Sequence, residues 1–204
     1  MAYRDFDLKK VKQTFELQID EQSNLFADVE PRQASLTLVQ TLNETVNLAI
    51  AINTEKARSE MIIAPILLEI RRQAHYEISL FSGTEFNIDA PRGLSGYYDY
   101  IISLSKEQLM VNTPVFMIVE AKNENIKGGL GQCVAEMVAA QIFNQQEGQV
   151  IEIIYGAVTT GEIWKFLKLR GSVVSIDLSD YYIGGDRDKI LGILHRGIKP
   201  PVLT

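Results

Sequence analysis

The chain has 204 residues, of which 46% are hydrophobic and 23% are charged. This is enough chain for one domain with a sizeable core, and the composition is that of an ordinary globular protein. No apolar run approaches the roughly 18 residues that cross a bilayer. The first ten residues, MAYRDFDLKK, lack the apolar segment of a signal peptide. The sequence therefore predicts a soluble, cytoplasmic protein.

Apart from carboxylates, metal-binding side chains are few. Cys133 is the single cysteine, and His75 and His195 are the two histidines. One cysteine excludes an internal disulfide framework and fits a reducing cytoplasm. With so little sulfur and imidazole, a zinc site is unfavourable. A metal ion here would be held by oxygen, which favours Mg²⁺, Mn²⁺ or Ca²⁺.

The formal net charge of −6 argues against a broad basic surface for nucleic acid. The acidic excess is uneven along the chain, however. Residues 1–120 hold 11 basic and 17 acidic side chains, whereas residues 121–204 hold 9 of each. The second part is neutral and could still present a local basic face.

The first part of the chain predicts one strand and two helical segments. Residues 11–20, VKQTFELQID, alternate between apolar and polar and predict an early strand. Residues 28–53 place apolar side chains at helical spacing and predict an amphipathic helix. Residues 54–74 predict a second helical segment, in which Pro65 either kinks the helix or lies in the first turn of a new one.

The pattern then changes to the period of two that is typical of strands. Strands are predicted at 76–83, 84–89, 97–105, 114–122, 150–160, 162–170 and 172–179, with a turn at 90–96 and helices at 127–146 and 186–197. The strand at 114–122 is apolar on both faces, as a central strand would be, whereas 162–170 alternates and predicts an outer strand. A helix between two buried strands indicates a parallel crossover. The fold class is therefore α/β or α+β, with one mixed sheet flanked by helices.

Three charged residues interrupt these apolar strands. Asp99 lies in YYDYIIS, and Glu120 and Lys122 close VFMIVEAK. An isolated carboxylate in an apolar interior is costly unless it is paired, protonated or bound to a metal. Residues two apart on a strand share a face, so Glu120 and Lys122 are neighbours and Ala121 turns away. If the two strands pair, all three charges meet at one edge of the sheet.

Two further polar residues lie on predicted helices. Gln132 starts the helix that follows Lys122, and Glu136 lies one turn further along on the same face. Glu60 precedes apolar residues at helical spacing, which places it on an inward-facing stripe where an acid needs a partner. Alternatively, Glu60 is an exposed acid favoured by the dipole at the start of a helix.

This set of residues predicts phosphodiester hydrolysis. Two carboxylates and a backbone carbonyl can hold Mg²⁺, which lowers the pKa of bound water and neutralises the phosphate. A lysine beside the metal can orient the nucleophile or stabilise developing negative charge. The alternative interpretation is a plain ion pair at the end of a strand.

The segments SEMIIAPILLEI, GYYDYIIS, VFMIVEAK, GLGQCVAEM and YGAVTTGEIWKFLKL resemble, in this order, the PD-(D/E)XK nuclease superfamily. The greatest similarity is to the N-terminal nuclease domain of the motor subunit of type I restriction enzymes and to its stand-alone relatives. The resemblance implies a Mg²⁺- or Mn²⁺-dependent DNA endonuclease. Asp99, Glu120, the Ala121 carbonyl and Glu60 would bind metal, directly or through water, Lys122 would position the attacking hydroxide, and Gln132 would orient Lys122 or a phosphate.

The resemblance covers roughly residues 57–170. It departs from the family in lacking a proline before Asp99, and the chain carries no G-x-x-x-x-G-K-S/T loop of a helicase motor. Residues 1–56 form an N-terminal extension of a strand and a helix, and that helix could be a homodimer surface. A protein partner could supply target specificity.

Two readings of another class remain open. The fold could serve as a binding or scaffold module without turnover, which the net negative charge favours. The chain could also be a structural dimer whose strand charges are ion pairs.

Overall fold

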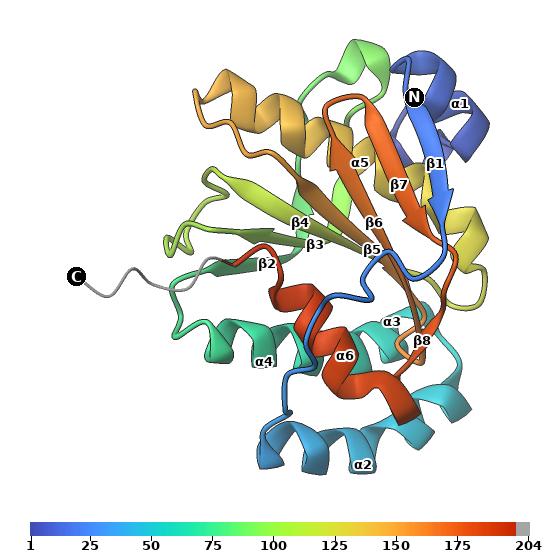
Figure 1. Cartoon of the computed structure of the whole chain (residues 1–204), viewed down its shortest axis with the longest axis vertical. Helices are drawn as coiled ribbons and strands as arrows, with labels where there is room; N and C mark the ends of the chain where they lie inside the picture. Colours follow the sequence, from blue (N-terminus) through green and yellow to red (C-terminus); the bar gives the residue numbers. More distant parts are fainter. Residues whose placement is uncertain (199–204) are drawn as a thin grey trace.

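The computed structural model describes residues 1–198 and is built around one mixed sheet (Figure 1). The strands are β1 (Gln18–Gln22), β2 (Ser79–Glu85), β3 (Tyr97–Ser103), β4 (Val115–Ala121), β5 (Ile154–Thr159), β6 (Ile163–Arg170), β7 (Val173–Asp177) and β8 (Tyr181–Tyr182). Their order is β1-β7-β6-β5-β4-β3-β2, with β8 beside β6. The pairs β4–β5 and β1–β7 are parallel and the others are antiparallel. The predicted mixed α/β class is confirmed.

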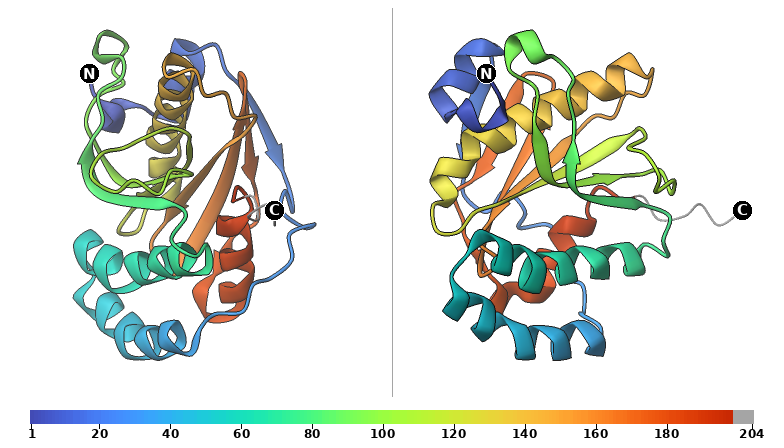
Figure 2. Two further views of the ribbon diagram at one scale, coloured as in Figure 1. Left: turned by 90° about the vertical axis from the view of Figure 1, so that its left-hand side faces the viewer. Right: turned by 180° about the vertical axis from the view of Figure 1, so that it is seen from behind.

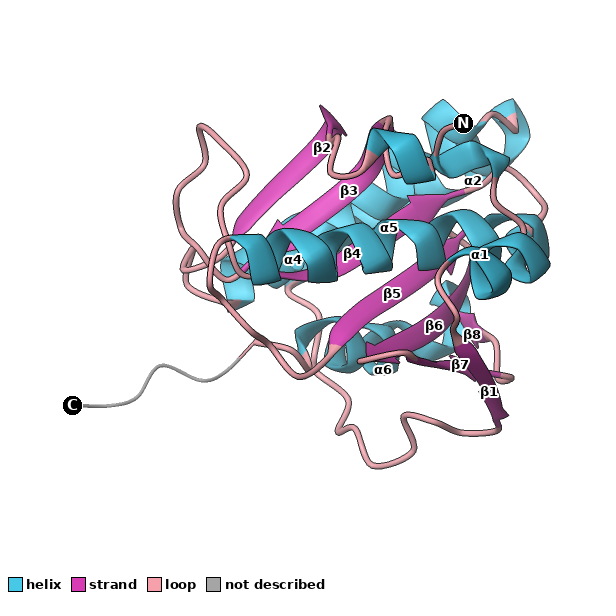
Figure 3. Ribbon diagram, turned by 90° about the horizontal axis from the view of Figure 1, so that it is seen from above, coloured by secondary structure: helices cyan, strands magenta, loops and turns pink. Residues whose placement is uncertain are grey.

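Helices cover both faces of the sheet (Figures 2 and 3). They are α1 (Leu8–Thr14), α2 (Leu36–Ile52), α3 (Glu55–Arg58), α4 (Ala64–Gln73), α5 (Ile126–Gln146) and α6 (Ile183–His195). Helices α1 and α5 lie on one face, and α2, α3, α4 and α6 lie on the other. As predicted, α5 is the crossover between the parallel strands β4 and β5. Among residues 1–198, no helix is long and apolar enough to cross a membrane.

Short polar side chains fix where the helices begin. Asp7 accepts the amide of Lys10 (2.7 Å) at the start of α1, and Asn125 accepts the amide of Gly128 (2.8 Å) at the start of α5. Such caps satisfy amides that have no partner within the helix. Pro65 lies in the first turn of α4 and follows a π turn at Ser59–Ile63. The second of the two predicted roles for Pro65 is therefore confirmed.

Three predicted elements were wrong in detail. Residues 11–20 form the end of α1 and the start of β1, because the Asp7 cap starts a helix that buries Val11 against α5. Residues 76–89 contribute one strand, β2, instead of two. Strand β6 was predicted to be an outer strand but is internal, because it hydrogen-bonds to β5 on one side and to β7 and β8 on the other.

Arg58 ties the second helical segment to the sheet. Its buried guanidinium donates to the Thr160 carbonyl (3.1 Å), to the Glu162 carboxylate (2.7 Å) and to Asn53 Oδ1 (3.1 Å). We expect Arg58→Leu to lower the free energy of unfolding by roughly 2 to 3 kcal/mol, because three acceptors lose their donor. Urea unfolding measures this loss. Glu162→Gln is the control: it should cost clearly less, since two of the acceptors remain paired, and equal losses would contradict the interpretation.

Candidate active site

The structure brings together the charged residues that the sequence singled out. Strand β3 pairs antiparallel with β4, so Asp99 lies beside the end of β4. Asp99 Oδ2 accepts the backbone amide of Ala121 (2.8 Å). Lys122 Nζ forms an ion pair with Glu120 Oε1 and donates to Gln132 Oε1 (3.3 Å). The prediction that Asp99, Glu120 and Lys122 come together is therefore confirmed, and they meet at the end of β4.

A sharp twist of β3 positions Asp99. The Tyr98 hydroxyl donates to the Glu136 carbonyl on α5 (2.9 Å), whereas the Tyr100 hydroxyl donates to the Ser59 carbonyl on the opposite face (3.0 Å). Residues two apart on a flat strand share a face, so the strand must twist between them. Gly83 of β2 lies opposite Asp99 and has a φ of +62°, a conformation that favours glycine.

Behind Lys122 the polar groups continue into the core. Gln132 Nε2 donates to Glu136 Oε1 (3.0 Å), which holds the Gln132 amide with its oxygen toward Lys122. Glu120 is 1% exposed and Glu136 is fully buried. The second carboxylate oxygen of each, Oε2, has no hydrogen-bond partner among the described residues. Unpartnered buried carboxylate oxygens are costly and therefore informative.

The electrostatics of this cluster follow from burial. Burial raises the pKa of Glu120 to about 8, with a further contribution from Asp99, and Lys122 opposes the shift. Burial also raises the pKa of Glu136 well above its usual value, and the nearby Glu120 adds to the effect. Burial lowers the pKa of Lys122, but the Glu120 carboxylate outweighs it and the net shift is upward. At neutral pH Lys122 is therefore a cation and not a base.

The raised pKa of Glu120 predicts a pH-dependent stability of the metal-free protein. The folded state keeps a proton up to about pH 8 that the unfolded chain, with an ordinary value of 4.5, has already lost. Stability that this group contributes at low pH is therefore lost as the pH rises toward 8. We expect Glu120→Gln to gain stability relative to wild type between pH 6 and 9, on the order of a few kcal/mol.

Urea unfolding across this pH range, in EDTA, measures the difference. The exposed Glu147 supplies a control, because Glu147→Gln should track wild type at every pH. A constant difference between Glu120→Gln and wild type would contradict the assigned shift.

The glycines at the start of α5 serve close packing. Gly128, Gly129 and Gly131 lie within the helix, in agreement with the helix predicted at 127–146. A Cβ on Gly129 would lie 3.0 Å from Lys122 Cγ and 2.8 Å from Val158 Cγ1. A Cβ on Gly131 would lie 2.4 Å from Asp7 Cα, so the N-terminal segment crosses α5 at this position. Gly129 therefore leaves the space that the Lys122 side chain occupies.

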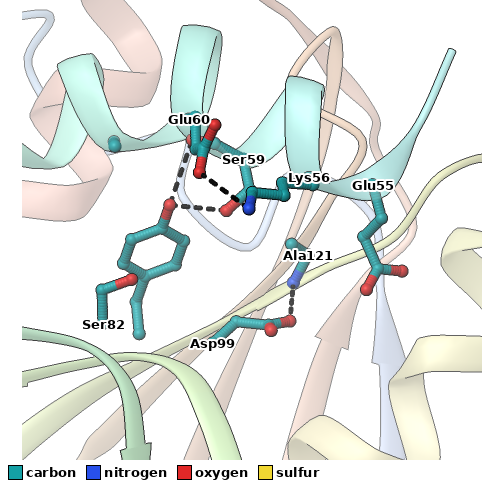
Figure 4. Close-up of a pocket in the computed structure, with 9 residues that line it drawn as sticks. Glu55, Lys56, Ser59, Glu60, Ser82, Asp99 and Ala121 are labelled. Carbon is teal, nitrogen blue, oxygen red and sulfur yellow. Dashed lines mark hydrogen bonds and ion pairs between the residues drawn. The ribbon is translucent and has the colours of Figure 1, made fainter.

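A cleft of about 320 Å³ opens in front of Asp99 and Ala121 and is bounded by α3 and the π turn (Figure 4). Glu60 lines its outer part, but its side chain is 62% exposed and pairs with Lys56 (3.8 Å). The predicted buried stripe is therefore wrong for Glu60. The π turn contains Glu60, and its wider turn breaks the 3.6-residue phase on which that prediction depended.

Glu55, which the sequence analysis did not single out, points toward the strands that carry Asp99 and Ala121 (Figure 4). Burial raises the pKa of Glu55; Lys122 lowers it and Asp99 raises it, so all three charges share one electrostatic environment. Its position directly after the Thr54 cap gave the only signal in the sequence, and a first-turn acid is common in any helix.

The side chains at this site supply some, but not all, of the oxygen ligands that a divalent cation needs. No three or more His, Cys, Asp or Glu side chains in residues 1–198 are grouped closely enough to hold a metal ion by themselves. A cation at this site would therefore need the backbone carbonyl of Ala121 beside Asp99 and Glu120, a ligand set of hard oxygen atoms. The unpartnered, buried Glu120 Oε2 is the observation that fits such an ion.

Comparison with known proteins gives no further constraint. The chain matches no protein-family model, and no curated protein matches its sequence.

Proposed function

We propose that the protein is a metal-dependent nuclease of the PD-(D/E)XK type that hydrolyses phosphodiester bonds, with DNA as its substrate. One observation carries the proposal: Glu120, buried at the end of β4 beside Asp99 and Lys122, has one carboxyl oxygen, Oε2, with no hydrogen-bond partner among residues 1–198. A bound cation would displace the proton that Glu120 keeps at neutral pH and would stabilise its carboxylate. The ordered motif in the sequence supports the same chemistry.

Each residue has a role in this proposal. Asp99, Glu120 and the Ala121 carbonyl would hold Mg²⁺ or Mn²⁺, which when bound lowers the pKa of water and neutralises the phosphate. Lys122, a cation at neutral pH, orients the attacking hydroxide and stabilises the charge that develops on the phosphate. Gln132 holds the Lys122 ammonium in place through its side-chain oxygen.

We assign the role of the helix acid in this site to Glu55 in place of Glu60. Both acids are exposed, but the pKa of Glu55 responds to Lys122 and Asp99, whereas Glu60 pairs with Lys56. Glu55 would hold a water molecule of the hydrated cation. This assignment replaces the role that the family resemblance gave to Glu60.

Nicking of supercoiled plasmid in Mg²⁺ or Mn²⁺, with EDTA as the control, tests the proposal directly. Metal-dependent nicking by the wild type supports it. Absence of both nicking and Mn²⁺ binding would instead favour the non-catalytic binding module.

A further inference from the structure

A second hollow, of about 360 Å³, lies beside Gln132. It is lined by two segments, Ala2–Arg4 and Ser95–Tyr97, and by Gln132 itself. Gln132 also contacts Lys122, so this hollow lies next to the side chains of the proposed chemistry.

The walls of the hollow are held in place. The Tyr3 amide donates to the Ser95 carbonyl (3.2 Å) and its buried hydroxyl donates to the Phe86 carbonyl (2.7 Å). Gly96 has a φ of +138°, and a Cβ there would lie 3.3 Å from the Tyr3 ring. These contacts fix the N-terminal segment against the start of β3, so the hollow is formed before any ligand arrives.

Tyr97 and Arg4 line this hollow, and neither has a role in the proposed catalysis. Tyr97 is 67% exposed, whereas the adjacent Tyr98 is buried. Arg4 is exposed and takes part in none of the ion pairs among residues 1–198. The neighbouring carboxylate of Asp5 accepts the Ala2 amide (2.8 Å). An exposed aromatic ring beside a free guanidinium matches a base and its phosphate.

More positive charge lies on the same N-terminal segment. Helix α1, which packs against α5, carries the exposed Lys9 and Lys12. The exposed carboxylates of Asp5 and Asp7 lie on the same segment, so its charge is mixed, and the local basic face expected in residues 121–204 stays a prediction.

We propose that this hollow binds an unpaired nucleotide of the strand that is cut, with its base stacked on Tyr97 and its phosphate held by Arg4. The inference rests on the proposed nuclease function and adds a substrate class to it: single-stranded DNA, or a duplex with a base displaced next to the scissile phosphate. An unpaired base exposes the face that stacking needs, which a base within a duplex does not.

Fluorescence anisotropy of a labelled oligothymidylate of about 12 nucleotides, in EDTA so that no cleavage occurs, tests the proposal. We expect Tyr97→Ala to weaken binding about tenfold and Tyr97→Phe to retain it, because stacking needs only the ring. Tyr182→Ala is the matched control, since Tyr182 is another exposed tyrosine, 51% exposed and outside the hollow. Arg4→Ala should reduce the slope of log affinity against log salt by about one.

A blunt-ended duplex of two annealed strands, which has no unpaired base, is carried through the same titrations as the comparison. We expect Tyr97→Ala to leave its binding unchanged. Three results would each overturn the inference: Tyr97→Ala binds oligothymidylate as wild type does, the wild type does not bind it, or Tyr97→Ala loses the same affinity for both probes. Plasmid nicking is measured separately. If the protein nicks plasmid but oligothymidylate binding does not depend on Tyr97, only the nucleotide site is refuted. If binding depends on Tyr97 but no nicking occurs, only the nuclease function is refuted.

Discussion

Replacing Lys122 with alanine is expected to lower plasmid nicking by at least about 100-fold and to leave the protein folded. The Lys122 ammonium bonds to both Glu120 and Gln132, and in the proposed mechanism it stabilises the charge that develops on the phosphate, so its loss should slow cleavage. The raised pKa of Glu120 lets that carboxyl stay protonated at neutral pH, which avoids a buried unpaired charge in the variant. Initial nicking rates in Mn²⁺, measured together with thermal unfolding, check both parts.

Lys127 offers the matched control, because it is an exposed lysine on the first turn of α5. Lys127→Ala should nick at the wild-type rate. If Lys122→Ala nicked at that rate as well, Lys122 would be reduced to a structural ion pair and the assigned centre would be wrong.

The second large effect concerns metal binding. We expect Asp99→Asn and Glu120→Gln each to weaken Mn²⁺ binding at least about tenfold, because each removes a charged oxygen ligand from a small ligand set. Both variants should fold. The side-chain amide oxygen introduced by Asp99→Asn can still accept the Ala121 backbone amide, and the side chain introduced by Glu120→Gln is uncharged, as the Glu120 carboxyl is below about pH 8. Isothermal titration calorimetry in buffers of different ionisation enthalpy measures the affinity and the proton released from Glu120.

A pair of helix variants separates the two acids at the cleft. Glu55→Gln should weaken Mn²⁺ binding, whereas Glu60→Gln should leave it unchanged, because Glu60 pairs with Lys56 at the surface. The reverse order would restore the role that the resemblance implied for Glu60. Unchanged Mn²⁺ affinity in Glu120→Gln would rule out a metal site at this edge of the sheet.

Part of the candidate site was predictable from the sequence because Glu120 and Lys122 lie at the end of a regular strand, β4. Alternation of side chains places Glu120 and Lys122 on one face whatever the rest of the fold does. The strongly apolar run before Glu120 also marks β4 as central, and all seven of its residues are buried. Only the pairing of β3 with β4 had to be assumed in order to bring Asp99 to the same edge.

The periphery of the site was not predictable in this way. A π turn changes the phase of a helix without any clear signature in the sequence. The sequence therefore placed Glu60 on the inward-facing stripe and did not single out Glu55. The N-terminal segment lies outside the resemblance, and its contact with α5 depends on Gly131, whose missing Cβ admits Asp7. A glycine in a helix gives no indication of which distant segment fills the space beside it.

The parallel pairing of β1 with β7 links Gln18 to Val173 and Gln22 to Asp177. Strand β1 and its hydrogen-bonding partner β7 lie far apart in the chain, and β2 to β6 lie between them in sequence. Pairings between positions so distant in the chain are slow to form, because the loop between them must first be ordered. The N-terminal segment that carries Arg4 and crosses α5 is therefore followed by β1, a strand that is among the last to be secured. A chain interrupted before β7 would leave β6 as an unprotected edge of the sheet.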